Sequence, residues 1–423
     1  MEPSLSDNRA RVDDDVSLPG SRKRLLVVAY AFSPILGSEY RQAWELVNFF
    51  SRSYDVTVLF GDSDGLMGST DHFDSYASAR QLPFKAVKVE ATPRQVHMAR
   101  RMLRMPWGLF FPLLLKKWHD KALAIAQQLH SEEPFDVVHQ LGPIGFRNPG
   151  HMWKLGCHSY WGPIGGAQFI DTSMIRDKWS AYYLEALFRN LSVRLQAYSP
   201  YIARAARGFD RLSYATVENA RYFAQHYGRD GPVISDQGLY QIDIPDVEPD
   251  QAPLRVVWAG SLIARKNVDL LLDAIRNAPS DIRFDVVGDG PLARSVAEAA
   301  TTHPNLQFHG RLPRQEVMTV LRQSDVILLT SLSEANTAIL FEGLENGCIP
   351  IAPRINGFVS TLNDKVAYLI DQGNHEEAVR QIVQALMALQ ESGTRVRYRA
   401  ALKQHLPTLS WEALGRTHES QYV

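Results

Sequence analysis

Short apolar segments alternate with helical patterns along the first half of the chain. Three runs rich in Leu, Val and Phe are Arg24–Ala31, Tyr54–Phe60 and Phe135–His139. Runs of this length with few polar breaks are typical of strands buried on both faces of a parallel sheet. Amphipathic patterns predict helices between them, over Tyr40–Ser51 and Lys116–His130. The alternation predicts a doubly wound α/β domain over residues 21–235.

The same alternation restarts after a polar stretch with several prolines, which we interpret as a linker at residues 236–252. Five more apolar runs follow, at Arg255–Ala259, Arg283–Val287, Leu306–His309, Val326–Leu329 and Ile349–Ala352. The helical patterns between them cover Val268–Ala278, Pro291–Thr301 and Pro313–Gln323. A second Rossmann-like domain is therefore predicted over residues 253–400. Ligands of such sheets bind beyond the carboxyl ends of the strands, so two facing sheets with a cleft between them are expected.

Length and composition agree with two domains. The 423 residues exceed the usual size of one compact domain, and 45% hydrophobic with 22% charged residues is ordinary for a globular protein. Residues 1–20 are polar and contain Asp13-Asp14-Asp15, which predicts a flexible tail and no signal peptide. No apolar run is long enough for a membrane span. Cys157 and Cys348 form no metal or redox spacing and suit a reducing, cytoplasmic location.

The net charge of −1 conceals an asymmetry between the halves. Residues 21–240 contain 26 Lys and Arg against 19 Asp and Glu, whereas residues 241–423 contain 17 against 22. Within the basic half, residues 94–121 interleave Lys and Arg with Met, Leu, Trp and Phe. Two interpretations stay open: peripheral contact with an anionic membrane on its inner face, or a helix whose apolar side packs in the core. No nucleic-acid partner is expected, because no recognition motif is present.

A basic turn follows the predicted strand Arg255–Ala259. Gly260 allows the backbone to turn sharply and to approach a ligand closely. Arg265 and Lys266 then supply a planar guanidinium and a compact ammonium, which together suit a diphosphate. The alternative is a solvated basic turn without a ligand.

Two glutamates, Glu334 and Glu342, flank the segment Asn336-Thr337-Ala338. The segment lies between an apolar strand and a predicted helix, and the first N–H groups of that helix can bind an anion. Carboxylate oxygens can accept hydrogen bonds from sugar and ribose hydroxyls. Taken singly, each glutamate is more often a solvated surface residue.

Together with the glycine turn at Val286–Leu292, these segments resemble the GT-B glycosyltransferases, and specifically the retaining family 4 (glycosyl transferases group 1). The resemblance covers residues 253–372 and includes Leu312–Val317 and Glu345–Pro350. It continues at Ser410-Trp411-Glu412, which resembles the last helix of the family. The resemblance implies a GT-B fold, with two Rossmann-like domains facing across a cleft and residues 401–423 crossing back to the first domain.

The resemblance also implies roles for the matching residues. Arg265 and Lys266 would hold the donor diphosphate, Glu334 the hydroxyls of the transferred sugar, and Glu342 the nucleotide ribose. Positive charge on the leaving diphosphate would do more for the reaction than a protein base. The other donor-site candidates are Gly37, Ser38, Gly260, Asn336, Thr337 and Ala338, and the candidates near the sugar or acceptor are Glu39, Trp161 and Gly162.

Two departures from the family pattern bear on the sugar site. Ala335 and Asn336 stand where the family has glycine and an aromatic or aliphatic residue, which bears on the loop shape and on the sugar accepted. The family histidine after the fifth strand is absent; His139 and His158 are nearby, and His139 is either a direct participant or structural. Asp62-Ser63-Asp64 resembles a metal motif of another glycosyltransferase fold, but turn chemistry accounts for it, so neither a metal nor a cofactor is expected.

The residues and the resemblance together predict a retaining glycosyltransferase. It would move a hexose-type sugar from a nucleotide-diphosphate donor to a glycan or lipid-linked saccharide. Two alternatives stay open: a catalytically silent GT-B protein that binds a glycan or a partner transferase, and a GT-B sugar-nucleotide epimerase. The intact set of charged candidates favours the transferase, because a binding scaffold needs no complete diphosphate site.

Overall fold

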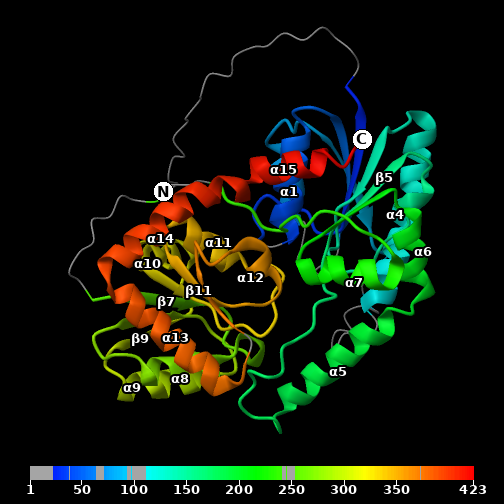
Figure 1. Cartoon of the computed structure of the whole chain (residues 1–423). Coiled ribbons are helices and arrows are strands. Elements are labelled where there is room, and N and C mark those ends of the chain that lie inside the picture. The colour runs from blue at the N-terminus through cyan, green and yellow to red at the C-terminus, as the bar shows by residue number, and fades with distance from the viewer. Residues whose placement is uncertain are drawn as a thin grey trace.

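A computed structural model describes residues 22–37, 39–62, 71–92, 97, 111–240, 244, 253–371 and 373–423. These residues form two six-stranded parallel sheets with helices around them (Figure 1). The expected tail, the candidate Ser38, the greater part of the expected linker and more than half of segment 94–121 lie outside the described residues.

The first sheet has the strand order β3-β2-β1-β4-β5-β6, and all its neighbours are parallel. Its strands are β1 (Arg24–Ala29), β2 (Asp55–Asp62), β3 (Lys85–Glu90), β4 (Val137–Gln140), β5 (His158–Ile164) and β6 (Arg211–Tyr214). Its helices are α1 (Glu39–Phe50), α2 (Asp71–Ser78), α4 (Phe111–Glu132), α5 (Ala181–Gln196), α6 (Pro200–Gly208) and α7 (Val217–Tyr227). Helices cover both faces of β1, because Leu26 and Val28 belong to one core cluster and Leu25 and Val27 to another.

The second sheet has the order β12-β11-β10-β7-β8-β9 and is also parallel. Its strands are β7 (Arg255–Ala259), β8 (Arg283–Val287), β9 (Leu306–Gly310), β10 (Val326–Leu328), β11 (Ile349–Pro353) and β12 (Tyr368–Ile370). Its helices are α8 (Val268–Asn277), α9 (Ala293–Thr302), α10 (Arg314–Arg322), α11 (Ala338–Glu345), α12 (Asn356–Thr361) and α13 (His375–Gln390). One continuous core cluster fills this half.

The apolar runs located eight of these strands, and β7 and β8 have the predicted bounds. Four strands were not predicted. β3 is an edge strand with one fully buried side chain, Val89, so its sequence KAVKVE carries no strong apolar signal. β5 contains Gly162-Pro163, a turn signal, and β6 and β12 are only 4 and 3 residues long.

Side chains of segment 94–121 are described only at residues 97 and 115–121, so the choice between the membrane and the packing interpretation stays open. Leu115 and Trp118 of α4 are buried, whereas Lys116 and Lys117 are exposed. The Trp118 indole Nε1 donates a hydrogen bond to the Val89 carbonyl at 3.1 Å, which ties α4 to the edge strand β3. Of the helices in the described ranges, none has the length and the apolar character that a membrane crossing requires.

The C-terminal helices α14 (Ser392–His405) and α15 (Trp411–Glu419) lead from the second half back to the first (Figure 1). α15 packs against α1 at very short range, because a Cβ added to Gly415 would lie 2.4 Å from the Phe49 ring. An ion pair between Arg52 Nη1 and Glu412 Oε2, at 2.7 Å, lies beside this contact.

A second crossing, at residues 170–176, was not predicted. This segment leaves the first half, and Ile170, Met174 and Ile175 are buried in the core cluster of the second half. The Ser173 hydroxyl donates to the Gly373 carbonyl at 2.8 Å. Arg176 pairs with Asp273 of α8 at 3.2 Å. α5 follows directly, so it starts at the second half and ends against the first.

Candidate active site

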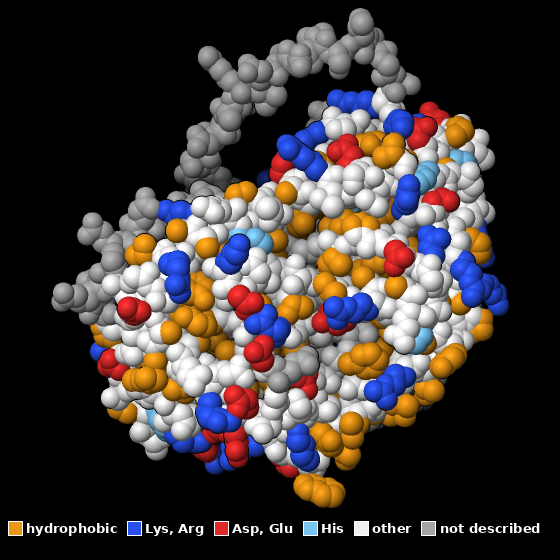
Figure 2. All heavy atoms as spheres, viewed as in Figure 1, with side chains coloured by type: hydrophobic (Ala, Val, Ile, Leu, Met, Phe, Trp, Pro, Cys, Tyr) orange, Lys and Arg blue, Asp and Glu red, His pale blue; other side chains and the backbone are white. Residues whose placement is uncertain are grey.

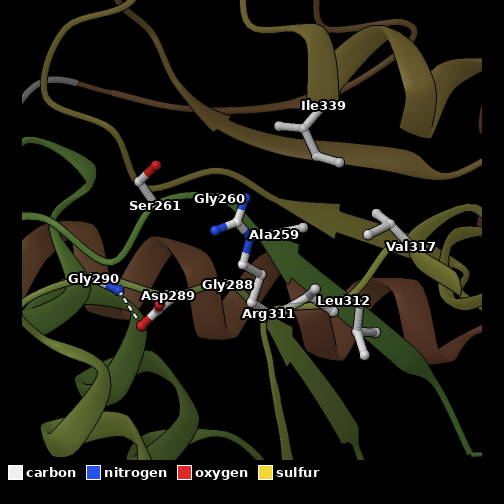
Figure 3. Close-up of a pocket in the computed structure, with 11 residues that line it drawn as sticks. Ala259, Gly260, Ser261, Gly288, Asp289, Gly290, Arg311, Leu312, Val317 and Ile339 are labelled. Atoms are coloured by element: carbon white, nitrogen blue, oxygen red, sulfur yellow. Dashed lines mark hydrogen bonds between the residues drawn. The ribbon is translucent and has the colours of Figure 1, made fainter. Parts of the chain in front are cut away.

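Glycine turns at the carboxyl ends of β7 and β8 form one wall of the site. Gly260 and Gly288 have φ angles of 157° and 152°. A Cβ added to Gly288 would lie 1.9 Å from the Gly260 carbonyl oxygen, so the two turns touch backbone to backbone. The space in front of them is an open cavity of about 560 Å³ (Figure 3). Its walls are Ala259, Gly260, Ser261, Val287, Gly288, Asp289, Gly290, Arg311, Leu312, Val317 and Ile339.

Arg265 and Lys266 meet Glu334 beside these turns. The two cations lie on a short 3-10 helix, Ala264–Lys266, which ends at Asn267 in the left-handed conformation. Glu334 Oε1 lies 2.6 Å from Arg265 Nη1 and 2.7 Å from Lys266 Nζ. Lys266 is only 8% exposed, so its ammonium depends on this carboxylate for charge compensation.

Buried hydrogen bonds hold the two cations in position. The Thr330 hydroxyl donates to the Lys266 carbonyl at 2.6 Å and accepts from the Trp258 indole at 3.0 Å. The Leu332 amide donates to the Arg265 carbonyl at 3.0 Å. The basic turn is therefore fixed against the end of β10 and is not a freely solvated turn, and its role in ligand binding stays a prediction.

The loop after Glu334 approaches α12 without a positive φ angle at Ala335. The left-handed residue at this contact is Asn356, with φ 46°. Its neighbour Gly357 lies so close that an added Cβ would come within 1.0 Å of the Ala335 carbonyl oxygen. The conformational freedom that the family glycine supplies is thus not needed at position 335, because the contact uses Asn356 and Gly357 instead.

The Asn336 side chain, a donor-site candidate, is occupied by protein partners. Its amide nitrogen donates to Asp236 Oδ1 at 2.6 Å, and its oxygen accepts from the Thr361 hydroxyl at 2.8 Å. Burial raises the pKa of Asp236 to about 6. Thr337 is the N-cap of α11 and makes no side-chain cap bond there, and Ala338 is exposed at the first turn.

Glu342 lies on α11 and pairs with a residue that the sequence analysis did not single out. Arg314 Nη2 lies 3.1 Å from Glu342 Oε1. Burial raises the pKa of Glu342, and the nearby arginines Arg314 and Arg41 oppose that rise. Arg311 of the cavity wall is a second unpredicted cation. Both lie beside Leu312-Pro313. Arg314 belongs to the family-like segment Leu312–Val317, but neither cation was singled out as a site residue.

In the first half, Glu39 is the first residue of α1 and lies close enough to Asp236 to be influenced by its charge. Burial, reinforced by the Asp236 charge, raises the pKa of Glu39 to about 7. Its Oε2 atom is buried and has no hydrogen-bond partner among the residues that the structure describes. Gly37 is exposed, and a Cβ added to it would touch no atom of the described residues within 4 Å. Glu39 is thus a carboxyl that changes protonation near neutral pH at the border of the two halves.

Two first-half candidates lie in the core and do not line the site. Trp161 is 2% exposed and packs against Phe209 and Phe223. Gly162 is needed for packing, since an added Cβ would lie 2.1 Å from the Ser213 hydroxyl. Their place in a buried strand, β5, explains why aromatic and glycine residues occur there.

His139 has the surroundings of a structural histidine, and a direct catalytic role stays an untested alternative. It is completely buried, and its Nδ1 and Nε2 lie 2.8 Å from the Tyr422 hydroxyl and the Gly162 carbonyl. Burial lowers its pKa to about 3, so the ring is neutral at physiological pH. His158 is likewise bonded, to the Gln421 carbonyl at 2.9 Å. Both histidines are therefore hydrogen-bonded to the C-terminal segment that follows α15.

Helix α5 of the first half adds two residues near the cation pair. The charges of Arg265 and Glu334 both influence the pKa of Tyr182, which burial raises to about 12. Burial lowers the pKa of Arg189, and Arg265 acts in the same direction. Neither residue gave a signal in the sequence, because their proximity depends on the crossing at residues 170–176.

Within the described ranges, no group of three or more His, Cys, Asp or Glu side chains is arranged to hold a metal ion. Ser63 and Asp64 of the metal-like motif lie outside those ranges. The expectation of a metal-independent reaction therefore stays a prediction.

Comparisons with known proteins identify a family domain in the second half of the chain. Residues 241–403 match the family model described as Glycosyl transferases group 1. A phosphatidylinositol N-acetylglucosaminyltransferase component from Arabidopsis thaliana is 29% identical over 150 residues, which are 34% of this chain and 33% of that protein. The chain thus matches about a third of the length of this curated relative.

Solved structures match over nearly the whole chain. The lipopolysaccharide outer core galactosyltransferase WaaB, in its apo form, has a TM-score of 0.62 and 11% identity, covering 94% of this chain and 98% of that one. Anabaena HepE in complex with UDP has a TM-score of 0.57 and 12% identity, with coverage of 94% and 98%. These likenesses confirm the predicted GT-B fold. The second half therefore contains a glycosyl transferases group 1 domain within a GT-B architecture.

Proposed function

We propose that the protein is a retaining glycosyltransferase that takes a hexose-type sugar from a nucleotide-diphosphate donor. The observation that carries the proposal is the convergence of Arg265 and Lys266 on Glu334, next to the glycine-walled cavity. Two cations fixed at a sheet edge supply the positive charge that a leaving diphosphate requires. A carboxylate in the same place supplies acceptors for sugar hydroxyls.

The cavity suits the nucleoside part of the donor. Its volume of about 560 Å³ lies in the range of small-molecule sites, and its glycine turns let a ligand approach the backbone. Glu342 lies on α11, beside the cavity residue Ile339, and is the proposed acceptor for ribose hydroxyls. The diphosphate would then lie at Arg265 and Lys266, and the sugar at Glu334.

In the proposed reaction, the bond between sugar C1 and the diphosphate oxygen breaks, and a bond from C1 to the acceptor oxygen forms on the same face. The acceptor proton passes to the leaving phosphate oxygen. Arg265 and Lys266 stabilise the charge that develops on the diphosphate. No protein base is required, which agrees with the burial of His139.

The acceptor is proposed to be a glycan or a lipid-linked saccharide, and the location cytoplasmic, at the inner face of a membrane. The relatives support this class of acceptor by their names alone: one is named for phosphatidylinositol and one for the lipopolysaccharide outer core. The nucleotide-bound HepE structure contains UDP, which makes UDP-sugars the first donors to test.

The test is calorimetric binding of UDP-, GDP- and ADP-sugars and their bare diphosphates. One nucleotide series should bind at micromolar levels, and Lys266→Ala should abolish that binding and lower turnover at least about tenfold, or about 1.4 kcal/mol in transition-state binding. Lys365→Ala, at an exposed lysine near β12, is the matched control and should leave both unchanged.

Equal binding and turnover in Lys266→Ala and the wild-type chain would contradict the assignment of the site. Absence of both binding and transfer with every donor would instead support the silent GT-B alternative. Isomerisation of a donor without nucleotide release would support the epimerase.

A further inference from the structure

Helix α5 carries an apolar stripe that points away from the protein. Leu184, Leu187, Leu191 and Leu195 are 61%, 43%, 52% and 62% exposed. At 100° per residue these four positions lie within an arc of about 80°, so they form one continuous stripe. Helices at a protein surface normally turn such a stripe toward the core.

The opposite side of α5 makes the core contacts. Ala186 is buried in the core cluster of the second half, and Val193 in one of the clusters of the first half. The helix is therefore anchored on one side in both halves. The leucine stripe contributes nothing to that packing and is a second, separate apolar face.

Aromatic and basic side chains border the stripe. Trp179, just before the N-cap Ser180, is 92% exposed, and Tyr198, just after the C-cap Ala197, is 81% exposed. Arg194 is exposed beside the stripe, and Glu185 is the single acidic residue of α5. Lys178, next to Trp179 and Asp177, is also exposed, and its ammonium donates to the Thr172 and Ser173 carbonyls. Hydrophobic side chains with basic ones beside them follow the lower right edge of Figure 2, where α5 runs in Figure 1.

We propose that this face of α5, from Trp179 to Tyr198, docks onto the headgroup region of an anionic lipid bilayer. Leucines that reach the acyl boundary, aromatic residues at both ends and flanking cations are the features that a helix lying in this region requires. A second copy of the chain fits less well. A two-fold interface sets the same patch against itself, and would bring the cations of one copy toward those of the other.

Docking through α5 would also orient the cleft. Tyr182 and Arg189 lie on the side of α5 away from the stripe, and both interact electrostatically with Arg265. The helix that contacts the bilayer is thus the helix next to the cation pair. The leucine stripe shares no residue with the proposed donor site, so docking through it does not depend on the donor chemistry.

The test measures partitioning of the full chain onto phosphatidylcholine vesicles with and without phosphatidylglycerol. The wild-type chain should bind the anionic vesicles more tightly. Leu187→Gln/Leu191→Gln should lower the partition coefficient at least about tenfold, because glutamine keeps the helix but removes the apolar contact. Met387→Gln/Val396→Gln, at exposed apolar positions of α13 and α14, is the matched control and should bind like the wild-type chain.

A second variant separates charge from hydrophobic contact. Arg194→Gln should weaken binding to anionic vesicles about fivefold and leave binding to neutral vesicles unchanged. Undiminished binding of Leu187→Gln/Leu191→Gln would overturn the proposal, as would absence of wild-type binding. Sedimentation that shows a wild-type dimer, converted to a monomer by the same two substitutions, would overturn it in favour of self-association. Calorimetry of nucleotide binding, unchanged in these variants, shows that the folded site is intact.

Discussion

The pairing of Glu334 with Arg265 and Lys266 predicts that Glu334→Gln binds a bare nucleoside diphosphate more tightly than the wild-type chain. The carboxylate occupies both cations that would receive the diphosphate, at 2.6 and 2.7 Å. The ligand must displace it before it can bind there. A neutral glutamine competes less strongly, because hydrogen bonds between two ionised groups are stronger than those with a neutral partner.

The size of the effect follows from the two displaced contacts. The amide keeps a hydrogen bond to each cation but removes the attraction between opposite charges. For ion pairs near a protein surface that attraction contributes up to about 1 kcal/mol per pair, so each contact is weakened by about 1 kcal/mol. The Arg265 side chain is 37% exposed, so its contact counts for less. We expect a net gain of about 1.4 kcal/mol, which is about a tenfold lower Kd.

The assay is calorimetric titration of the bare diphosphate, with turnover of the intact donor measured in parallel. Turnover should fall in Glu334→Gln although the diphosphate binds more tightly, because the proposed contact with the sugar hydroxyls is lost. Glu342→Gln is the control with the opposite sign. Its carboxylate is proposed to accept from the ribose, so its loss should raise the Kd.

An unchanged or higher Kd in Glu334→Gln would refute the reasoning, because the carboxylate would then not compete with the ligand. A lower Kd in both variants would show that the tighter binding comes from the loss of a negative charge in general, and not from the contacts of Glu334 with the two cations. Only opposite shifts support separate roles for the two glutamates.

Two further predictions concern stability. Gly288→Ala should lower the free energy of unfolding by about 3 kcal/mol and abolish nucleotide binding, because its Cβ would lie 1.9 Å from the Gly260 carbonyl oxygen. Gly37→Ala, whose Cβ meets no atom within 4 Å in the part of the chain that the structure describes, should unfold like the wild-type chain. Glu39 has a pKa of about 7 in the folded state against 4.5 in the unfolded one, so the native state holds a proton that the unfolded state has released, and stability falls as pH rises from about 4.5 to 7. Glu39→Gln should remove about 3 kcal/mol of that decline in denaturant titrations and leave the part due to Asp236 between about 4 and 6. An identical pH profile would contradict the assignment.

Much of the fold could be predicted because the buried strands are apolar on both faces. β7 and β8 lie between two layers of helices, so side chains on both faces of each strand contribute to the apolar pattern in the sequence. The edge strand β3 contains lysines, so its sequence shows no such apolar pattern. The crossing at residues 170–176 was also missed, since its partners, such as Asp273 and Gly373, are distant in sequence.

The candidate site was predicted unevenly for the same reason. Arg265 and Lys266 follow a strand directly, so local sequence places them at the sheet edge. The occupation of Asn336 by Asp236, 100 residues away, could not be read from local pattern. Trp161 and His139 lie on β5 and β4, strands whose carboxyl ends are expected to face a ligand. The direction of a side chain in such a buried strand depends on how α15 and Tyr422 pack around it.

The crossing at residues 170–176 bears on how the two halves could be recombined with those of other proteins. A cut within residues 241–252 looks natural, because it separates the two sheets. It would nevertheless leave Met174 and Ile175 with the first half, while the hydrophobic core that buries them stays with the second. It would also separate α15 from α1. A working chimera therefore needs four junctions, so that residues 170–176 stay with the second half and residues 411–423 with the first.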